Sequence, residues 1–311
     1  MCPVCISTAT LLVAGGALGG GLAALAVTGR REKGAAGRKD EGGLNMESST
    51  VERPRVVSRA EWLVARTALL AKEKELTRAG DELSRQRRAL PWVRVDEPYL
   101  FEGSDGKETL ADLFAGRSQL IVKHFMLGPG WKEGCVGCSF GADHLDGALV
   151  HLENHDVTLV AVSRAPWREI EAFKARMGWR FKWVSSSGSG FNYDYHVSFT
   201  KDEVARGAGF YNYKAQPVPG DDSAGISVFY RDASGGVFHT YSCYARGDEK
   251  TAGTYMLLDL TPKGRNETGP NHNLSDWVRH HDRYGAGGFV DATGRYHPTP
   301  ADDAGCPCDE G

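Results

Sequence analysis

The chain has 311 residues, of which 41% are hydrophobic and 25% are charged, and its formal net charge is −3. This composition is typical of a globular protein with room for one large domain or two ordinary ones. Nucleic-acid-binding proteins usually carry an excess of basic residues, which this chain lacks, so we expect no nucleic-acid partner. Seven cysteines are too few for a small scaffold held together by disulfides.

The N-terminus contains an uncharged apolar stretch at residues 6–27. Its length suits a helix that crosses a bilayer. Gly15 and Gly19 have the G-x-x-x-G spacing that permits close contact between membrane helices. Residues 1–29 are therefore a candidate membrane anchor, with membrane attachment through residues 6–27.

Residues 30–55 are predicted to be a basic, flexible linker, since they are rich in Gly, Ala, Lys and Arg and have no periodicity. Basic residues after an apolar span favour a cytoplasmic location for the rest of the chain, on the inner face of the membrane. Two alternatives stay open at this point. The apolar stretch is a cleaved signal peptide, or translation starts at Met46 and the protein is soluble and cytoplasmic.

A long helix is predicted from Ser58 to about Ala89. Ser58-Arg59-Ala60-Glu61 matches a capping box, and Pro91 stops the helix. One apolar stripe recurs every seven residues, at Trp62, Leu69, Leu76, Leu83 and Leu90. Because the second seam of a coiled coil is poor, we expect this amphipathic helix to dock on the following domain.

The next part of the chain alternates between strands and helices. Short strands are predicted at 93–95 and 99–101, a turn at 103–106, and a short helix at 109–114. Apolar runs predict buried strands at 120–125, 157–162 and 181–184, separated by helices at 138–154 and 166–177. This alternation favours a parallel sheet with flanking helices.

An antiparallel hairpin is predicted after these units, with strands at 226–230 and 237–244 joined by the turn residues 232–236. A short helix is predicted at 277–284, and residues 286–311 are predicted to be a flexible tail. Parallel units followed by an antiparallel hairpin give a mixed α/β sheet with flanking helices, as in thioredoxin-like proteins. We expect this thioredoxin-like domain to span residues 56–285.

The sequence Cys135-Val136-Gly137-Cys138 comes after the predicted strand 120–125 and a Gly/Pro loop, and it opens a helix. In a thioredoxin-like sheet this is the position of a redox dithiol, where a helix N-terminus lowers the pKa of a thiol. Cys135, nearer the loop, is predicted to be the attacking thiolate, and Cys138, one turn later, the resolving thiol. The predicted reaction is thiol–disulfide exchange without a cofactor, between a protein or small-molecule disulfide or thiol and a reducing partner thiol protein.

Two alternatives to this activity remain. Cys135 could react with peroxides, as in a thiol peroxidase of the peroxiredoxin type. The domain could also be a non-catalytic binding module whose thiols are structural or bind a metal. A zinc site would need His124 or His144 beside the dithiol, but no second C-x-x-C or H-x-x-x-H stands nearby, so no metal is predicted.

Five further residues are candidates for supporting roles. Trp131 and Lys132 precede the dithiol, and Arg164 follows a strand at the edge where open α/β sheets place their sites. His239 and Tyr241 alternate along one strand, so they are expected to share a face that looks toward the dithiol. His239 would then be a proton shuttle. Each of these residues also has a purely structural reading: a solvated loop charge, a helix cap or a packed core side chain.

Two other close cysteine pairs, Cys2/Cys5 and Cys306/Cys308, have no predicted fold around them, and Cys243 is alone. We expect the two terminal pairs to be spectators.

Several motifs between Val56 and Tyr284 occur together in one known family. They are Ser58-Arg59-Ala60-Glu61-Trp62, Leu90-Pro91-Trp92-Val93, Gly134-Cys135-Val136-Gly137-Cys138-Ser139, Val162-Ser163-Arg164-Ala165-Pro166, Arg176-Met177-Gly178-Trp179, Phe191-Asn192-Tyr193-Asp194, His239-Thr240-Tyr241-Ser242 and Trp277-Val278-Arg279. The chain resembles the bacterial thioredoxin-like family catalogued as domain of unknown function 899, whose members are described as predicted dithiol-disulfide oxidoreductases. The resemblance implies a thioredoxin-like fold with peroxiredoxin-like features.

The chain departs from better-known thioredoxin-like enzymes at two places. Trp131 lies four residues before Cys135 instead of next to it. Ala224-Gly225 stands where such enzymes usually carry a proline, just before the strand that faces the dithiol. The second departure weakens the expectation that ordinary disulfide substrates dock there.

Overall fold

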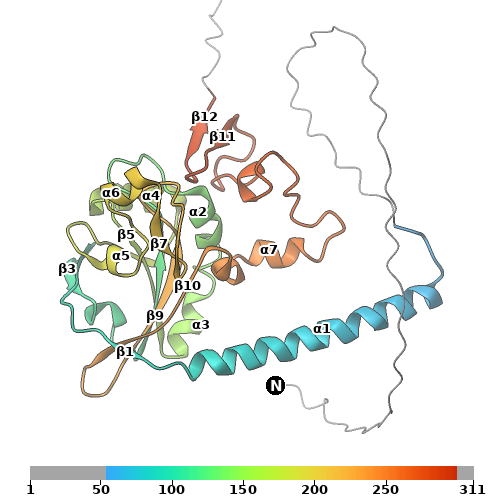
Figure 1. The fold of residues 1–311 in the computed structure, drawn as a ribbon, viewed down its shortest axis with the longest axis horizontal. Coiled ribbons are helices and arrows are strands. Elements are labelled where there is room, and N and C mark those ends of the chain that lie inside the picture. Colours follow the sequence, from blue (N-terminus) through green and yellow to red (C-terminus); the bar gives the residue numbers. More distant parts are fainter. Residues whose placement is uncertain (1–53, 300–311) are drawn as a thin grey trace, which may run out of the picture. The chain divides into compact units, whose positions relative to one another are not determined.

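The computed structural model of the protein describes residues 54–299 (Figure 1). Its helices are α1 (Arg59–Arg88), α2 (Val136–Ala142), α3 (Leu149–Asn154), α4 (Trp167–Met177), α5 (Phe191–Asp194), α6 (Lys201–Arg206) and α7 (Gly253–Leu258), with 3-10 turns η1 (Asp112–Phe114), η2 (Ala245–Thr251) and η3 (Leu274–Asp276). Its strands are β1 (Val93–Arg94), β2 (Leu100–Gly103), β3 (Gly106–Thr109), β4 (Gln119–His124), β5 (Val157–Ser163), β6 (Lys182–Ser185), β7 (Gly209–Tyr211), β8 (Lys214–Gln216), β9 (Gly225–Arg231), β10 (Val237–Tyr244), β11 (Gly288–Val290) and β12 (Tyr296–Pro298).

The main sheet has eight strands in the order β1-β10-β9-β4-β5-β6-β2-β3. Strands β4, β5 and β6 are parallel, β9 is antiparallel to β4, and β10 is antiparallel to β9. Three parallel strands beside an antiparallel hairpin form the mixed thioredoxin-like sheet that the sequence predicted. The dithiol comes after the central strand β4, which has a parallel neighbour on one side and an antiparallel neighbour on the other.

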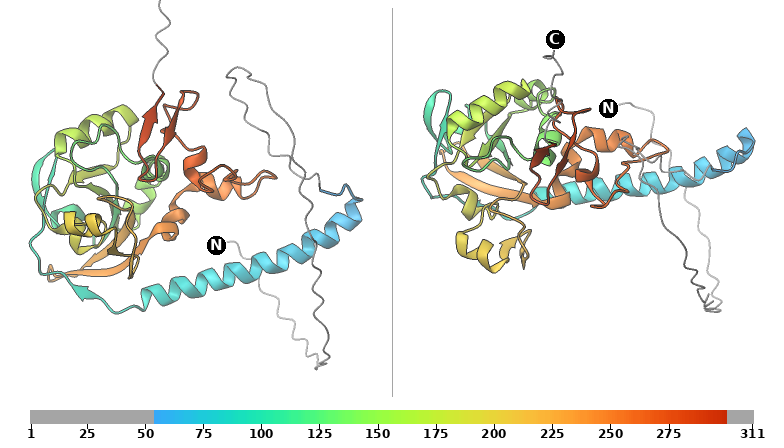
Figure 2. Two further views of the ribbon diagram at one scale, coloured as in Figure 1. Left: turned by 45° about the horizontal axis from the view of Figure 1, so that its top comes forward. Right: turned by 90° about the horizontal axis from the view of Figure 1, so that it is seen from above.

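Both faces of this sheet are covered. On one face, α2, α3 and α4 pack against alternate residues of the strands in a core that contains Leu145, Ile170, Phe173, Leu159 and Trp183. The connections from β4 to β5 and from β5 to β6 both place their helices on this face. This is expected, because crossovers between parallel strands are right-handed and these two proceed in the same direction along the sheet. On the other face, η1 and the segment around α5 cover Leu120, Val122, Val160 and Phe229. Figure 2 shows these layers from two further sides.

Local sequence signals account for most of the element ends. The side chain of Ser58 accepts the backbone N–H of Glu61, and Glu61 returns the bond, so the predicted capping box starts α1. Gly178, in the left-handed region with φ 67°, ends α4 as predicted. Every residue of β5 is buried, which explains why its sequence is mostly apolar.

The predicted helix 138–154 is two helices, α2 and α3, separated by turns. Polar side chains between them bond to a distant segment. Asp143 accepts the indole N–H of Trp179 at 2.8 Å, and Asp146 accepts the backbone N–H groups of Arg180 and Phe181. These tertiary bonds favour the break over a continuous helix.

The C-terminal part also differs from the predictions. The predicted helix at 277–284 is wrong, because only the short turn η3 forms, immediately before it. Residues 288–298, which were expected to belong to the flexible tail, form the hairpin β11–β12. The stripe on α1 is not docked on the domain, since none of the residues of α1 is buried and Leu76 is 75% exposed.

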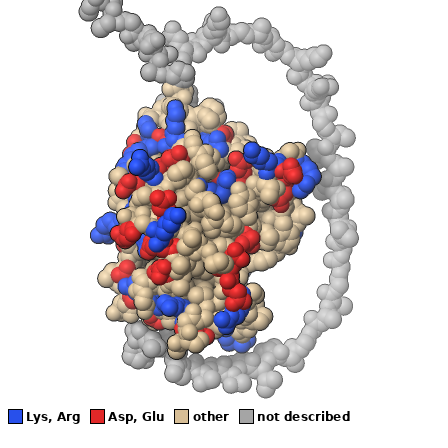
Figure 3. All heavy atoms as spheres, turned by 90° about the vertical axis from the view of Figure 1, so that its left-hand side faces the viewer, with Lys and Arg blue, Asp and Glu red and all other residues tan. Residues whose placement is uncertain are grey.

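The predictions for residues 6–27, for the linker up to residue 53 and for the terminal cysteine pairs lie outside the described residues. Among residues 54–299, none of the helices is both long and apolar enough to span a membrane. On the face that carries β3, acidic and basic side chains are interspersed (Figure 3).

Candidate dithiol site

Cys135 and Cys138 are free thiols at the start of α2, and both are buried. Cys135 is the N-cap residue, and its backbone N–H donates to the carbonyl of Met126 at 2.9 Å. The N–H of Met126 lies 3.5 Å from Sγ of Cys138. These contacts fold the Gly/Pro loop back on itself, so that both thiols face the segment that comes after β4.

The two thiols have opposite electrostatic surroundings. A hydrogen bond from the thiol of Cys138 lowers the pKa of Cys135, and the backbone N–H groups of Gly137 and Cys138 add to this effect against the cost of burial. The pKa of Cys138 is raised well above its usual value, first by donating to Cys135 and then by burial. Of the two thiols, Cys135 is therefore the one that ionises more readily.

Lys123 is a charged neighbour that the sequence reasoning missed. It lies on β4, is 3% exposed, and its positive charge lowers the pKa of both thiols. Its ammonium lies against α2, since a Cβ on Gly141 would stand 3.2 Å from Nζ. The available signal was a lysine within the mostly apolar strand β4, because a lysine is seldom fully buried.

The dithiol lines a cavity of about 570 Å³. Its wall combines the end of β4, the start of β9 and the C-terminal segments, and includes Met126, Tyr211, Asp222, Ala224, Asp248, Tyr255, Leu274 and Gly294. Ala224, just before β9, therefore does line the dithiol cavity. None of the peptide bonds among the described residues is cis.

The hairpin β11–β12 covers Cys135. The carbonyl of Gly294 accepts the N–H of Val136 at 2.9 Å, and a Cβ on Gly294 would stand only 2.6 Å from Sγ of Cys135. Gly294 has φ 83°, which together with this close approach explains why glycine occupies the position. The guanidinium of Arg295 lies 3.8 Å from the ring centroid of Trp131, which ties the hairpin to the loop before the dithiol.

Arg295→Ala is expected to increase the rate of Cys135 alkylation by about two- to fivefold, because losing a cation–π contact favours the open hairpin. The measurement is iodoacetamide labelling at Cys135, followed by peptide mass spectrometry. Lys132→Ala is the matched control, since it removes one positive charge from the exposed loop beside Trp131 and leaves Arg295 in place. Equal rates in Arg295→Ala and the control would contradict a covering role.

A second set of contacts fixes the loop residue next to Cys135. Nε2 of His280, fully buried, donates to the carbonyl of Gly134 at 2.8 Å. Glu133 pairs with Arg176 and with Arg283, at 2.5 and 2.8 Å. The carboxylate of Glu133 is therefore neutralised by two guanidinium groups and does not oppose the thiolate as a free charge.

A family model described as "Bacterial protein of unknown function (DUF899)" matches residues 51–284. The chain belongs to this family. The resemblance drawn from the sequence motifs is thus confirmed. A search of curated proteins gives no match.

Solved structures with detectable similarity to this DUF899 chain include peroxiredoxins. A cysteine-to-serine mutant of Xylella fastidiosa PrxQ is 14% identical, with a TM-score of 0.33 over 52% of this chain and 89% of that chain. Xanthomonas campestris peroxiredoxin Q is 15% identical, with a TM-score of 0.35 over 54% and 92%. Peroxidoxin BcpB from Mycobacterium tuberculosis is 13% identical, with a TM-score of 0.35 over 54% and 97%. At such scores the fold assignment rests on the strand order described above.

Arg164 of the DUF899 chain forms an ion pair with Asp222. Its guanidinium makes a bidentate pair with Asp222, with Nε–Oδ1 at 2.7 Å and Nη2–Oδ2 at 2.9 Å. Asp222 is buried, also accepts the hydroxyl of Ser198, and lines the dithiol cavity. Arg164 thus fixes a carboxylate in the wall, while Lys132 is an exposed loop residue.

The expectation that His239 and Tyr241 share a face is wrong. The register of β10 shifts between them, so His239 lies opposite Phe229 and Tyr241 lies opposite Val228. This β-bulge inserts Thr240 and sends the two side chains to opposite faces of the sheet. His239 contacts Tyr195 on the face away from α2 (5.2 Å between ring centroids), so it is not placed as a proton shuttle for the dithiol.

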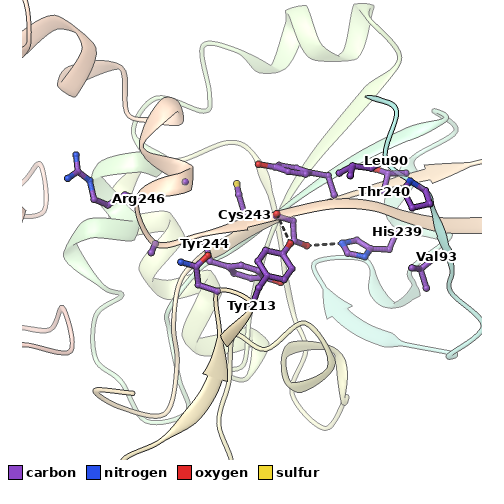
Figure 4. Close-up of a pocket in the computed structure, with 14 residues that line it drawn as sticks. Leu90, Val93, Tyr213, His239, Thr240, Cys243, Tyr244 and Arg246 are labelled. Carbon is purple, nitrogen blue, oxygen red and sulfur yellow. Dashed lines mark hydrogen bonds between the residues drawn. The ribbon is translucent and has the colours of Figure 1, made fainter. Parts of the chain in front are cut away.

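A chain of buried hydrogen bonds explains the place of His239 in this DUF899 fold. Nε2 of His239 lies 2.7 Å from Oγ of Ser242, which lies 2.7 Å from Oγ of Ser227, which lies 2.8 Å from Nε2 of His124. Burial lowers the pKa of His239, and it lowers that of His124 to about 3. Burial therefore disfavours the charged form of both rings. His239 also lines a cavity of about 820 Å³ along β10 (Figure 4).

Neither histidine considered for zinc lies with the dithiol. His124 stacks on Tyr195 on the opposite face of the sheet, and Nε2 of His144 lies 3.0 Å from the hydroxyl of Thr254. Within residues 54–299, no group of three or more His, Cys, Asp or Glu side chains is placed to hold a metal ion.

Proposed function

We propose that this protein is a thiol oxidoreductase in which Cys135 is the attacking thiolate and Cys138 the resolving thiol. The observation that carries the proposal is that the pKa values of two adjacent thiols are shifted in opposite directions. The pKa of Cys135 is lowered, chiefly by the neighbouring thiol of Cys138, whereas the pKa of Cys138 is raised. Both face one cavity of about 570 Å³. A low-pKa thiolate beside a protonated partner is the arrangement that disulfide exchange needs.

In disulfide exchange, Sγ of Cys135 attacks one sulfur of the substrate disulfide and releases the other as a thiolate. Cys138 then loses its proton, and its sulfur attacks Sγ of Cys135. This second step forms the Cys135–Cys138 disulfide and releases the remaining substrate thiolate. The enzyme has given two electrons to the substrate, and a reducing thiol partner returns them by the reverse exchange.

The cover over Cys135 favours small substrates, which makes a thiol peroxidase the second candidate. Here the thiolate of Cys135 attacks the distal oxygen of a hydroperoxide, and the leaving alkoxide takes a proton to become an alcohol or water. Cys135 becomes a sulfenic acid, and Cys138 condenses with it to give the same disulfide and one water. Asp248, whose pKa is raised by burial, lines the same cavity.

Mass spectrometry of the full chain in glutathione redox buffers tests the proposal. A Cys135–Cys138 disulfide should form and reverse, and Cys138→Ser should trap a mixed disulfide at Cys135. With hydrogen peroxide and dimedone, the same variant should carry a sulfenic-acid adduct if the peroxidase reaction operates. The oxidoreductase proposal fails if neither thiol reacts faster than free cysteine at neutral pH, and zinc that copurifies at these thiols would support a metal-binding module instead.

A further inference from the structure

A separate cavity of about 370 Å³ lies beside β4, β9 and β10, on the face of the sheet that α3 covers. Its wall is largely aliphatic, with Ile121, Leu145, Leu152, Leu159, Ile226 and Val228. The volume is within the range of natural small-molecule sites, which are mostly apolar with a few convergent polar groups. The shape and lining therefore suit the hydrocarbon part of a small ligand.

The buried polar group of this cavity is Lys123. The side chain is more than nine-tenths buried and lines the cavity. The nearest carboxylate oxygen, Oδ2 of Asp248, is 4.0 Å from Nζ. Burial raises the pKa of Asp248, which makes it a weaker counter-ion. An ammonium in this position is stabilised by an anion with direct hydrogen-bonding contact.

The remaining charged groups around the cavity give it a positive balance. Arg87, from the end of α1, and Lys250, from η2, line it together with Lys123, against the single carboxyl group of Asp248. Arg87 is held in place over the ring of Tyr241, 5.5 Å from its centroid. An anionic group is therefore favoured, and the aliphatic wall favours a chain attached to it.

We propose that this cavity binds a small amphipathic monocarboxylate, such as a medium-chain fatty acid. The carboxylate accepts hydrogen bonds from the ammonium of Lys123, and the hydrocarbon chain lies along the side chains of β4, β9 and α3. A neutral alcohol of the same length lacks the charge that Lys123 selects, and an amine of that length is repelled. This inference goes beyond the dithiol reaction and does not depend on it.

Isothermal titration of the reduced full chain with octanoate, octan-1-ol and octylamine tests the site. Octanoate is expected to bind at least about tenfold more tightly than octanol, which is the effect of one charge-assisted hydrogen bond. Octylamine is expected not to bind. Lys123→Met, which keeps an unbranched side chain but removes the ammonium, should remove this preference for octanoate over octanol.

Ala148→Phe gives a second, independent variant. Ala148 lines the cavity from the start of α3 and is partly exposed, so a phenyl ring there fills the space without touching the charge on Lys123. Both octanoate and octanol should lose binding in this variant. Because Ala148→Phe does not change Lys123, this test holds even where Lys123→Met does not fold. Equal affinity of octanoate and octanol for the unmodified chain, or undiminished octanoate binding in Ala148→Phe, would overturn the proposal.

Discussion

Near pH 6.5, Cys135 is expected to be alkylated faster than Cys138 in the unmodified chain, and Cys135→Ser is expected to abolish this rapid labelling. An ordinary thiol with a pKa near 8.5 is only about 1% thiolate at that pH. Cys135 has a lowered pKa and stays ionised further into the acid range, while the pKa of Cys138 is raised. Labelling at Cys135 should therefore be faster than labelling at Cys138 in the same chain, because the rate depends on the thiolate fraction.

The pH dependence of Cys135 alkylation in Cys138 variants measures how much the hydrogen bond from Cys138 contributes to the pKa of Cys135. The thiol of Cys138 donates to the thiolate of Cys135, so removing the donor must move the profile of Cys135 to higher pH. Cys138→Ala removes the donor and should shift the profile further than Cys138→Ser, which retains a hydroxyl. Labelling is measured peptide by peptide, which resolves the other cysteines. Identical profiles for the two variants would show that this bond does not set the pKa of Cys135.

Arg164→Met is expected to destabilise the protein by about 3–5 kcal/mol, because it leaves Asp222 as a buried carboxylate without its ion pair. Asp222 is 4% exposed and accepts hydrogen bonds from two of the three guanidinium nitrogens of Arg164. The free energy of unfolding is measured by urea denaturation. Arg164→Lys should recover only part of the loss, since an ammonium cannot make the bidentate pair.

The control for this prediction is the double variant Arg164→Met with Asp222→Asn. It removes both charges, so the desolvated carboxylate is gone and most of the lost stability should return. A double variant that is as unstable as Arg164→Met alone would mean that Arg164 acts through packing. In that case the ion pair would not be what fixes this wall of the dithiol cavity.

The sheet and its main helices could be predicted because their signals are local. The apolar run of β5, the turn at residues 232–236 and the glycine that ends α4 each specify an element without distant partners. The position of the dithiol is given by the same pattern, since it comes directly after a recognisable central strand. These features depend on periodicity and capping, which a single sequence carries.

The features that the sequence did not predict depend on contacts between distant segments. The hairpin β11–β12 has no strong periodicity and is fixed by bonds such as that from Val136 to Gly294, which lies near the other end of the domain. The bulge at Thr240 changes the face of His239 without changing the strand-like composition. The break between α2 and α3 depends on Asp143 meeting Trp179. Tertiary bonds of this kind leave no local pattern.

The contact of Gly294 with Cys135 also has a kinetic meaning. If the hairpin opens and closes faster than the thiolate reacts, the observed rate constant is the intrinsic one multiplied by the open fraction. A strongly ionised thiolate can then persist while reacting slowly with bulky oxidants, because ionisation and exposure are set by different contacts. The ratio of alkylation rates in the unfolded and native chain, corrected for ionisation, therefore measures the equilibrium constant for opening this hairpin.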